Sequence, residues 1–221
     1  MANRKISFIN DNYYHIYNRG IDKRIIFEND HDFKRFQESL RLFNSPNSIW
    51  LADANQKTEV KPQDRLVDIV CYCLMPNHFH LLLKQRVDSG IPNFMRKLGT
   101  GYSLYFNMRK ERSGSLFQGT YKAKLVTDDN YLTHLSRYIH MNPVELVDSN
   151  WKVAGIKNKR TAFDFLDKFQ WSSYPDFISE VSGKIISRSI LHEMFTPSSY
   201  KKFIESWLIK DLEQIAQLPW G

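Results

Sequence analysis

The chain has 221 residues, of which 42% are hydrophobic and 14% aromatic, enough to bury one good-sized domain with an appendage and to exclude a disordered chain. The 31 Lys and Arg residues outnumber the 24 Asp and Glu residues, and the formal net charge of +7 favours an anionic partner, nucleic acid before membrane. No apolar run reaches transmembrane length, no signal peptide is recognisable, and the two cysteines share one strand, so we expect a reduced, cytoplasmic protein.

The N-terminal third predicts one strand and one helix. Residues 12–20, "NYYHIYNRG", alternate in polarity and end in a glycine, which is typical of a strand stopped by a turn. Residues 29–44 place apolar side chains at helical spacing after Asn and Asp cap candidates, which predicts a helix. The polar, proline-containing residues 45–65 are interpreted as a long loop.

The middle of the chain predicts a hairpin followed by a long helix. Residues 66–75 are a nearly continuous β-prone run, "PN" is a tight turn, and residues 78–85 return as a second central strand. Residues 91–112 look helical at both ends, with "GTG" at 99–101 as a break or kink between them.

One more strand and helix complete the pattern. Residues 114–126 predict a strand interrupted near Gly119, and residues 127–143 predict a helix that ends before Pro143. The order β–α–β–β–α–β is that of a ferredoxin-like, split β-α-β fold of the α+β class, with an antiparallel sheet and helices. We therefore expect one domain over residues 1–150 and a mostly helical C-terminal extension over 151–221, with a terminal helix near 199–218.

Two histidines follow the "PN" turn. Because side chains alternate along a strand, His78 and His80 share one face, and the apolar Phe79 face enters the core, leaving both imidazoles facing a cleft. Two adjacent imidazoles bind one divalent ion if an oxygen ligand joins them. One alternative is two ordinary histidines at the rim of a strand. Another is a zinc site that includes Cys73, but a divalent ion that binds oxygen ligands does not require a thiolate.

The helix at 127–143 carries a second set of polar residues. His134, Tyr138 and Asn142 are spaced by four, so they lie on one face of the helix. A tyrosine one turn before an amide suits a nucleophile beside a metal ligand. The alternative is a core tyrosine with its hydroxyl hydrogen-bonded.

These motifs together resemble a known family. "PNHFHLLL" is similar to the His-hydrophobic-His motif of the HUH endonuclease superfamily, and "YIHMNPVELV" to the catalytic helix of its single-tyrosine transposases, particularly the REP-associated tyrosine transposases. "YHIYNRG" and "GSLFQGTYKAKLV" resemble that family's first and late strands, so the resemblance covers roughly residues 12 to 150. One departure is Thr120, where the family often has arginine, which leaves a phosphate contact there open.

The resemblance implies the HUH endonuclease fold and a role for each residue. His78, His80 and Asn142 would hold Mg²⁺ or Mn²⁺, and Tyr138 would attack a phosphodiester in single-stranded DNA to give a 5′-phosphotyrosine and a 3′-hydroxyl, after which the ends are rejoined. His134 is a candidate proton acceptor for Tyr138, with a structural histidine as the alternative.

Basic and aromatic residues alternate after the hairpin, which suits a groove that tracks a DNA backbone and stacks on bases. We expect DNA contacts from Arg96, Lys97, Tyr102, Tyr105, Arg109, Lys110, Arg112, Lys122 and Lys124.

The expected partner is single-stranded or hairpin DNA from palindromic repeats, with no membrane, and the protein is a monomer or a homodimer. Two alternatives remain open. One is a replication or relaxase-type nickase, whose histidine-rich metal triad is missing here. The other is a non-catalytic nucleic-acid-binding ferredoxin-like domain, which would need exposed aromatics where the chain has its histidine pair.

Overall fold

A four-stranded sheet forms the centre of the computed structural model, which describes residues 6–47, 60–179 and 184–206. The strands are β1 (Tyr13–Arg19), β2 (Val67–Met75), β3 (His78–Gln85) and β4 (Lys122–Leu125), in the spatial order β2-β3-β1-β4. Every neighbouring pair is antiparallel. This is the strand order of a ferredoxin-like sheet, so the predicted α+β fold class is confirmed.

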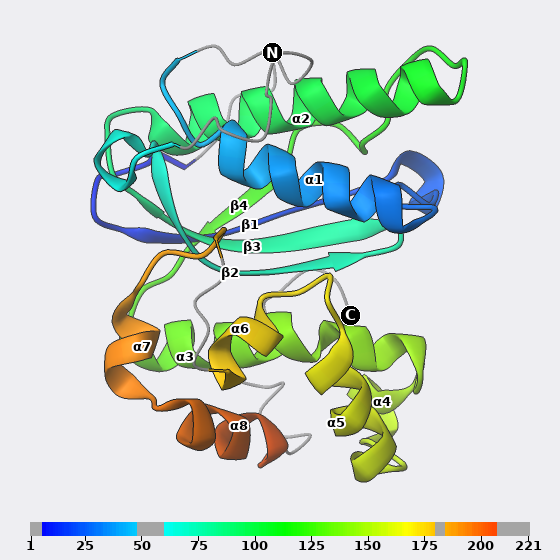
Figure 1. The fold of residues 1–221 in the computed structure, drawn as a ribbon, viewed down its shortest axis with the longest axis vertical. Helices are drawn as coiled ribbons and strands as arrows, with labels where there is room; N and C mark the ends of the chain where they lie inside the picture. The colour runs from blue at the N-terminus through cyan, green and yellow to red at the C-terminus, as the bar shows by residue number, and fades with distance from the viewer. Residues whose placement is uncertain (1–5, 48–59, 180–183, 207–221) are drawn as a thin grey trace.

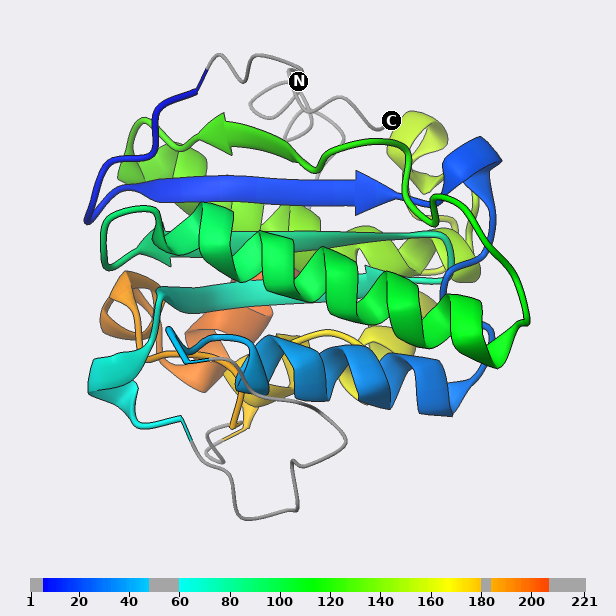
Figure 2. The ribbon, with the colours of Figure 1, turned by 90° about the horizontal axis from the view of Figure 1, so that it is seen from above.

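Helices cover both faces of the sheet (Figure 1). Helices α1 (Asp30–Leu42) and α2 (Gly90–Arg109) lie side by side across one face, as the view from above shows (Figure 2). Helix α3 (Asp129–Met141) lies on the opposite face, followed by the short 3-10 helix η3 (Asn142–Leu146). Two further 3-10 turns, η1 (Ile21–Lys23) and η2 (Pro62–Asp64), lie in the connections.

Helix α1 forms where the sequence supplies both a cap and an apolar face. Asn29 accepts a hydrogen bond from the backbone N–H of Asp32 at 3.1 Å and caps α1. Phe36 and Leu40, one turn apart, are fully buried beneath that helix, and Phe36 packs on Phe79 of β3 with 5.1 Å between ring centroids. The Phe79 face of β3 therefore belongs to the core under α1 and α2, as predicted.

Two predicted elements differ from the structure. The expected break at 99–101 is wrong, because α2 runs without interruption through both glycines. A Cβ atom on Gly101 would lie 2.6 Å from the Phe43 ring, so this glycine permits a close helix contact. The strand expected over 114–126 is confined to β4; upstream of it, Phe117 forms only an isolated bridge to Gly20.

The C-terminal extension is helical where it is described. It contains α4 (Trp151–Ala154), α5 (Lys159–Lys168), α6 (Tyr174–Ile178), α7 (Ile190–Met194) and α8 (Pro197–Glu205), and the remainder of the expected terminal helix lies outside the described residues. The extension also pairs with the edge of the sheet, since the N–H of Leu74 in β2 donates to the carbonyl of Trp171 at 2.9 Å. Within the described residues, each helix is too short or too polar to cross a membrane.

Candidate functional site

The sheet face under α3 carries the predicted histidine pair. His78 and His80 alternate with Phe79 along β3, and Arg19 and Tyr17 of β1 lie directly opposite them in the antiparallel register. The expected open cleft is wrong: α3 covers this face, and only 1% of His80 is exposed, whereas His78 is partly exposed. His78 therefore lies at the border of the site, and His80 lies beneath α3.

Helix α3 brings Tyr138 onto this pair. Asp128 caps the helix by accepting a hydrogen bond from the N–H of Tyr131 at 2.8 Å, and the helix ends at Met141, just before Pro143. The Tyr138 ring stands edge-to-face on His80, with 5.6 Å between centroids, and 3% of the residue is exposed. A residue on a helix and a residue on a strand, far apart in the chain, thus share one buried site.

Asn142 closes the site one turn after Tyr138. Its Nδ2 donates to the carbonyl oxygen of Tyr138 at 2.9 Å, which fixes the amide at the end of α3. The amide also lies close to both neighbours: burial lowers the pKa of His78 and raises that of Tyr138, and a hydrogen bond with Asn142 opposes each of these shifts in part. Its Oδ1 is buried and has no hydrogen-bond partner among the described residues.

Two acceptor atoms of this cluster could bind a divalent ion. His80 Nε2 and Asn142 Oδ1 are both buried without a hydrogen-bond partner in the described part of the chain. Buried polar atoms normally have partners, and a cation is a partner that both of these acceptors could bind. No group of three His, Cys, Asp or Glu side chains is arranged to hold a metal ion in residues 6–47, 60–179 and 184–206, so a third protein ligand there would have to be of another type, as a carboxamide oxygen is.

Burial sets the protonation of the cluster. It lowers the pKa of His78 to about 4 and holds that of His80 well below the ordinary value of 6.5, so both rings are neutral and keep a lone pair near pH 7. Burial also raises the pKa of Tyr138 above 10, against a smaller opposite effect of the Asn142 hydrogen bond. In this arrangement the phenol is protonated and poorly nucleophilic.

Three residues of the site were missed in the sequence. Lys152 of α4 places its Nζ 5.5 Å from the centroid of the Tyr138 ring and 3.1 Å from a carboxylate oxygen of Glu145. His15 of β1 contacts His80, with 2.9 Å between His15 Nε2 and His80 Nδ1. The alternation of "YHIY" puts His15 on one face with Tyr17, but only the strand register shows that this face meets His80.

The predicted DNA-contact residues divide between the two faces of the sheet. Lys122 and Lys124 of β4 lie directly opposite Tyr17 and His15 of β1, on the same face as the histidine pair. Lys124 also places its Nζ 5.3 Å from the centroid of the Tyr131 ring in α3. These two lysines therefore extend the face of the site with positive charge.

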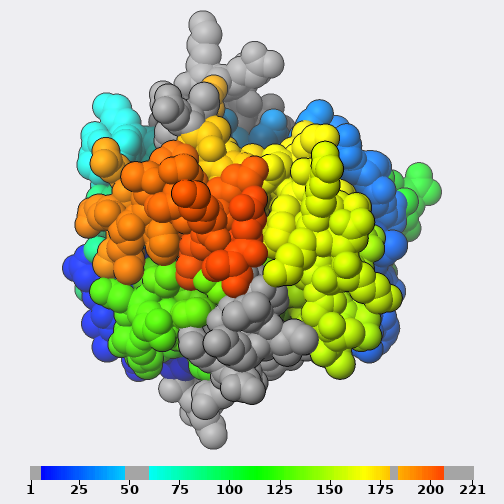
Figure 3. Space-filling view, turned by 90° about the horizontal axis from the view of Figure 1, so that it is seen from below, coloured from blue at the N-terminus to red at the C-terminus, as the bar shows by residue number. Residues whose placement is uncertain are grey.

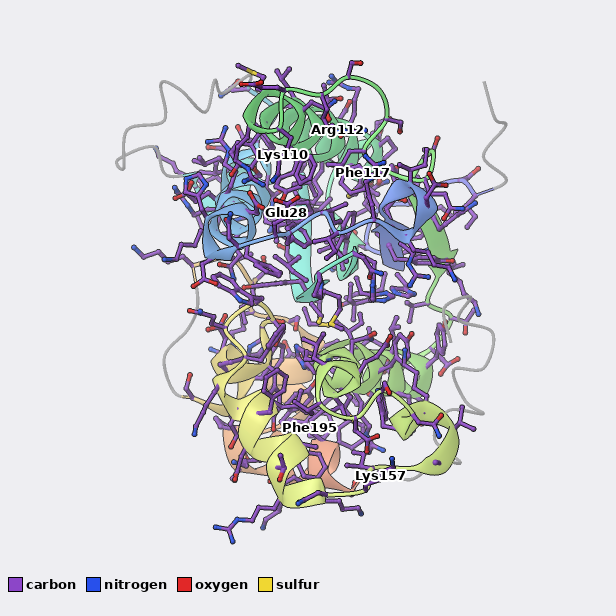
Figure 4. The ribbon with its side chains drawn as sticks, turned by 90° about the vertical axis from the view of Figure 1, so that its right-hand side faces the viewer. Glu28, Lys110, Arg112, Phe117, Lys157 and Phe195 are labelled. Carbon is purple, nitrogen blue, oxygen red and sulfur yellow. The ribbon has the colours of Figure 1, made fainter. Side chains whose placement is uncertain are left out.

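The residues of α2 lie on the other side of the sheet and are engaged within the protein. Arg109 pairs with the buried carboxylate of Asp32 at 2.8 Å and with Glu28 at 3.4 Å, and Lys110 also pairs with Glu28. Tyr105 donates its hydroxyl to Asp32 at 2.8 Å. Figure 4 shows Glu28 and Lys110 in the layer of α1 and α2, away from the α3 layer.

The other four residues also belong to the α2 side. Tyr102 is fully buried and donates its hydroxyl to the carbonyl of Ile26 at 2.6 Å, which makes it a core residue. Lys97 donates to the carbonyl oxygens of Pro46 at 3.1 Å and Asn47 at 2.8 Å, and Arg112 to that of Ser115 at 3.1 Å. Arg96 lines a groove between α2 and residues 115–121.

The C-terminal extension holds α3 in place. His140 of α3 is fully buried, and its Nδ1 and Nε2 each lie 2.8 Å from a hydroxyl oxygen, those of Tyr200 and Ser173. His134, one turn before Tyr138, packs its ring against Phe203 of α8, with 6.0 Å between centroids. Figure 3 shows the extension gathered around α3 on this face of the molecule.

Two of the comparisons with known proteins, those with family models and with solved structures, give matches. The model of a family described as "Transposase IS200 like" matches residues 9–142, which include the sheet, α1, α2, α3 and Asn142. One solved structure, that of a REP-associated tyrosine transposase bound to a REP hairpin, is similar at 12% identity and a TM-score of 0.49, covering 86% of this chain and 96% of the other. None of the curated proteins matches this chain.

Proposed function

Because the chain belongs to the IS200-like transposase family, we propose that it cleaves and rejoins single-stranded DNA with Tyr138 as the nucleophile. The observation that carries the proposal is the convergence of four side chains in one buried site. Tyr138 contacts His80 at 5.6 Å between ring centroids, and Asn142, one helical turn later, lies beside both Tyr138 and His78.

The proposed metal ligands are His78, His80 and Asn142, through the Nε2 atoms of the two rings and Oδ1 of the amide. A bound Mg²⁺ or Mn²⁺ would neutralise charge on the scissile phosphate. The chain's own contribution is to hold three uncharged ligands beside a tyrosine whose ring already contacts that of His80. Lys152, 5.5 Å from the Tyr138 ring, would place a positive charge near the same phosphate.

The proposed reaction is a transesterification. The Tyr138 hydroxyl loses its proton and its oxygen attacks phosphorus, the P–O3′ bond breaks, and the departing oxygen takes up a proton as a 3′-hydroxyl. The resulting 5′-phosphotyrosine keeps an ester bond to phosphorus, so a second 3′-hydroxyl restores a phosphodiester and frees Tyr138 without ATP. His134, one turn before Tyr138, is the proposed proton acceptor.

Burial of Tyr138 implies a movement before reaction. With 3% of the residue exposed and its pKa raised by burial, the phenol is shielded from a phosphodiester and stays protonated. DNA has to enter at the partly exposed His78 side and separate α3 from β3. The proposed substrate is a hairpin from palindromic repeats with a single-stranded flank, of the REP-associated kind that the sequence motifs resemble.

The test is formation of a covalent protein–DNA adduct. Hairpin oligonucleotides from the palindromic repeats that flank the gene are incubated with the protein and Mg²⁺ or Mn²⁺ and separated on a denaturing gel. We expect a metal-dependent adduct that disappears in Tyr138→Phe and His78→Ala and persists in Tyr131→Phe, a tyrosine of the same helix. Binding without an adduct, on these hairpins and with both metals, would leave a non-catalytic DNA-binding domain instead.

A mixing experiment tests whether the site is assembled from one chain. Tyr138 contacts His80 of its own chain, so we propose that cleavage occurs within a single protomer. A mixture of Tyr138→Phe and His78→Ala proteins is then expected to give no adduct. Recovery of the adduct in the mixture would mean that a homodimer exchanges α3 between its subunits.

A further inference from the structure

His15 is a buried histidine of β1 that the proposed chemistry does not use. It is 0% exposed, and its ring meets that of His80 edge to edge in nearly the same plane, with 5.1 Å between centroids and 19° between planes. His15 lies diagonally from His80 across the β1–β3 pair, since Leu82 is its direct partner. Diagonal neighbours on one sheet face are within reach of aromatic side chains, which brings His15 Nε2 within 2.9 Å of His80 Nδ1.

The neighbouring histidine shows how a ring at this site is oriented. His78 Nδ1 lies 2.6 Å from Asn77 Oδ1, and the Nδ2 of the same amide donates to the carbonyl of Lys23 at 3.3 Å. The second bond fixes the amide so that its oxygen faces His78. An amide oxygen accepts but does not donate, so the hydrogen of the neutral His78 ring is on Nδ1 and the lone pair is on Nε2.

If the His80 ring also carries its hydrogen on Nδ1 and its lone pair on Nε2, an acceptor is required next to His80 Nδ1. The atom there is His15 Nε2, which accepts only if the hydrogen of the His15 ring is on its own Nδ1. The reverse direction would put a hydrogen on His80 Nε2. Either direction leaves one buried N–H without a partner among the described residues, on His15 Nδ1 or on His80 Nε2, and only the first keeps a lone pair on His80 Nε2. A hydrogen there would block coordination.

We propose that His15 is a positioning residue that accepts the Nδ1 hydrogen of His80 and thereby directs the Nε2 lone pair of His80 at the metal. The inference rests on the proposed function, because it assigns a role toward the ion that His78, His80 and Asn142 would hold. Such partners of a metal-bound imidazole fix its tautomer and orientation, and their loss typically weakens metal binding by about 10- to 100-fold. The small angle between the two ring planes aligns this contact with the plane of each ring, as an imidazole hydrogen bond requires.

The position of the hydrogen is measured directly by long-range ¹H–¹⁵N NMR of the histidine rings in the metal-free protein. We expect the His80 hydrogen on Nδ1, as at His78, and the His15 hydrogen on its own Nδ1. A His80 ring that carries its hydrogen on Nε2 would overturn the proposal. This measurement needs neither metal nor DNA, so it decides the matter even if the proposed metal site fails.

Mn²⁺ affinity, measured by electron paramagnetic resonance of the free ion, gives the functional consequence. His15→Leu removes the acceptor and is expected to bind Mn²⁺ about 10- to 100-fold more weakly, whereas His15→Gln keeps an acceptor oxygen and is expected to lose less than about tenfold. Circular dichroism and thermal melting show whether each variant is folded. Equal affinity of His15→Leu and the unchanged protein, or equal losses in both folded variants, would overturn the proposal.

The same titration separates this inference from the proposed function. His78→Ala removes a proposed ligand and leaves His15 and His80 in place. If His78→Ala and the unchanged protein bind Mn²⁺ equally, the metal site itself is wrong. If His78→Ala loses binding while His15→Leu does not, the metal site stands and the role of His15 fails.

Discussion

The rings of Tyr138 and His80 form a T-shaped contact, with 5.6 Å between centroids and 81° between planes. This contact joins the helix that carries the proposed nucleophile to the strand that carries two proposed metal ligands. Together with the Nδ2 bond from Asn142 to the Tyr138 carbonyl, it defines the geometry from which the following predictions start.

Replacing Asn142 tests the third proposed ligand. Asn142→Ala removes the buried Oδ1 that has no partner among the described residues, so Mn²⁺ binding is expected to weaken by at least about tenfold. Asn142→Asp keeps an oxygen at this position and adds charge, so it is expected to bind Mn²⁺ at least as tightly as the unchanged protein. Isothermal titration calorimetry with both variants checks this. Equal binding by Asn142→Ala and the unchanged protein would remove Asn142 from the site.

The two glycines of α2 give a matched pair for helix packing. A Cβ atom on Gly99 meets nothing within 4 Å, so Gly99→Ala is expected to stabilise the protein by about 0.5–1 kcal/mol through helix propensity. A Cβ atom on Gly101 would lie 2.6 Å from the Phe43 ring, so Gly101→Ala is expected to destabilise it by about 1–3 kcal/mol. Urea unfolding measures both, and a stabilising Gly101→Ala would contradict the close contact between α1 and α2.

The position of the lysines relative to the site predicts which of them bind DNA. Lys122 and Lys124 share the sheet face of the histidine pair, so Lys122→Ala with Lys124→Ala is expected to lower the salt dependence of single-strand binding by about 1.4 in log–log slope. Arg109 and Lys110 pair with Glu28 on the opposite side of the sheet. Their replacement by Gln is expected to change the slope less, as fluorescence anisotropy at several salt concentrations would measure.

If the order of these two effects is reversed, single-stranded DNA follows α2 rather than the face under α3. In that case the DNA contacts predicted from the sequence for Arg109 and Lys110 are correct, and the DNA crosses the edge of the sheet to reach Tyr138.

Glu28 gives a pH dependence of stability. Its hydrogen bond to Lys110 is the largest cause that lowers its pKa below 4.5 in the folded protein. A carboxylate with a depressed folded pKa stabilises the protein above its unfolded pKa, and this contribution is lost as the pH falls through the folded pKa. The carboxylate is partly exposed, so we expect Glu28→Gln to cost less than about 1 kcal/mol at pH 7 and almost nothing at pH 3.

Urea unfolding of the two proteins at pH 7 and pH 3 measures this difference. Each protein is compared with itself across pH, so a constant packing cost of the substitution cancels. A Glu28→Gln cost that stays the same at both pH values would show that the Glu28 charge contributes nothing to stability.

Local pattern was sufficient for most of the elements. The "PN" turn and the alternation around it predicted the hairpin of β2 and β3, because strand residues alternate between faces whatever they pair with. The spacing of four placed Tyr138 and Asn142 one turn apart, and the structure has them joined at the end of α3. The break predicted at 99–101 was wrong because a glycine serves equally in a bend and in a close contact, and the pattern does not distinguish them.

The sequence by itself determined the strand and helix order, the shared face of His78 and His80, and the pairing of a tyrosine with an amide one turn later. Only the tertiary structure decided that α3 covers the histidine pair, that His15 reaches His80, and that Lys122 and Lys124 lie on that face while Arg109 and Lys110 do not. The reason is physical. The spacing at which side chains return to the same face of a strand or helix depends on the backbone conformation of a few neighbouring residues. Strand register, and the sheet face that a helix covers, depend on contacts between residues far apart in the chain.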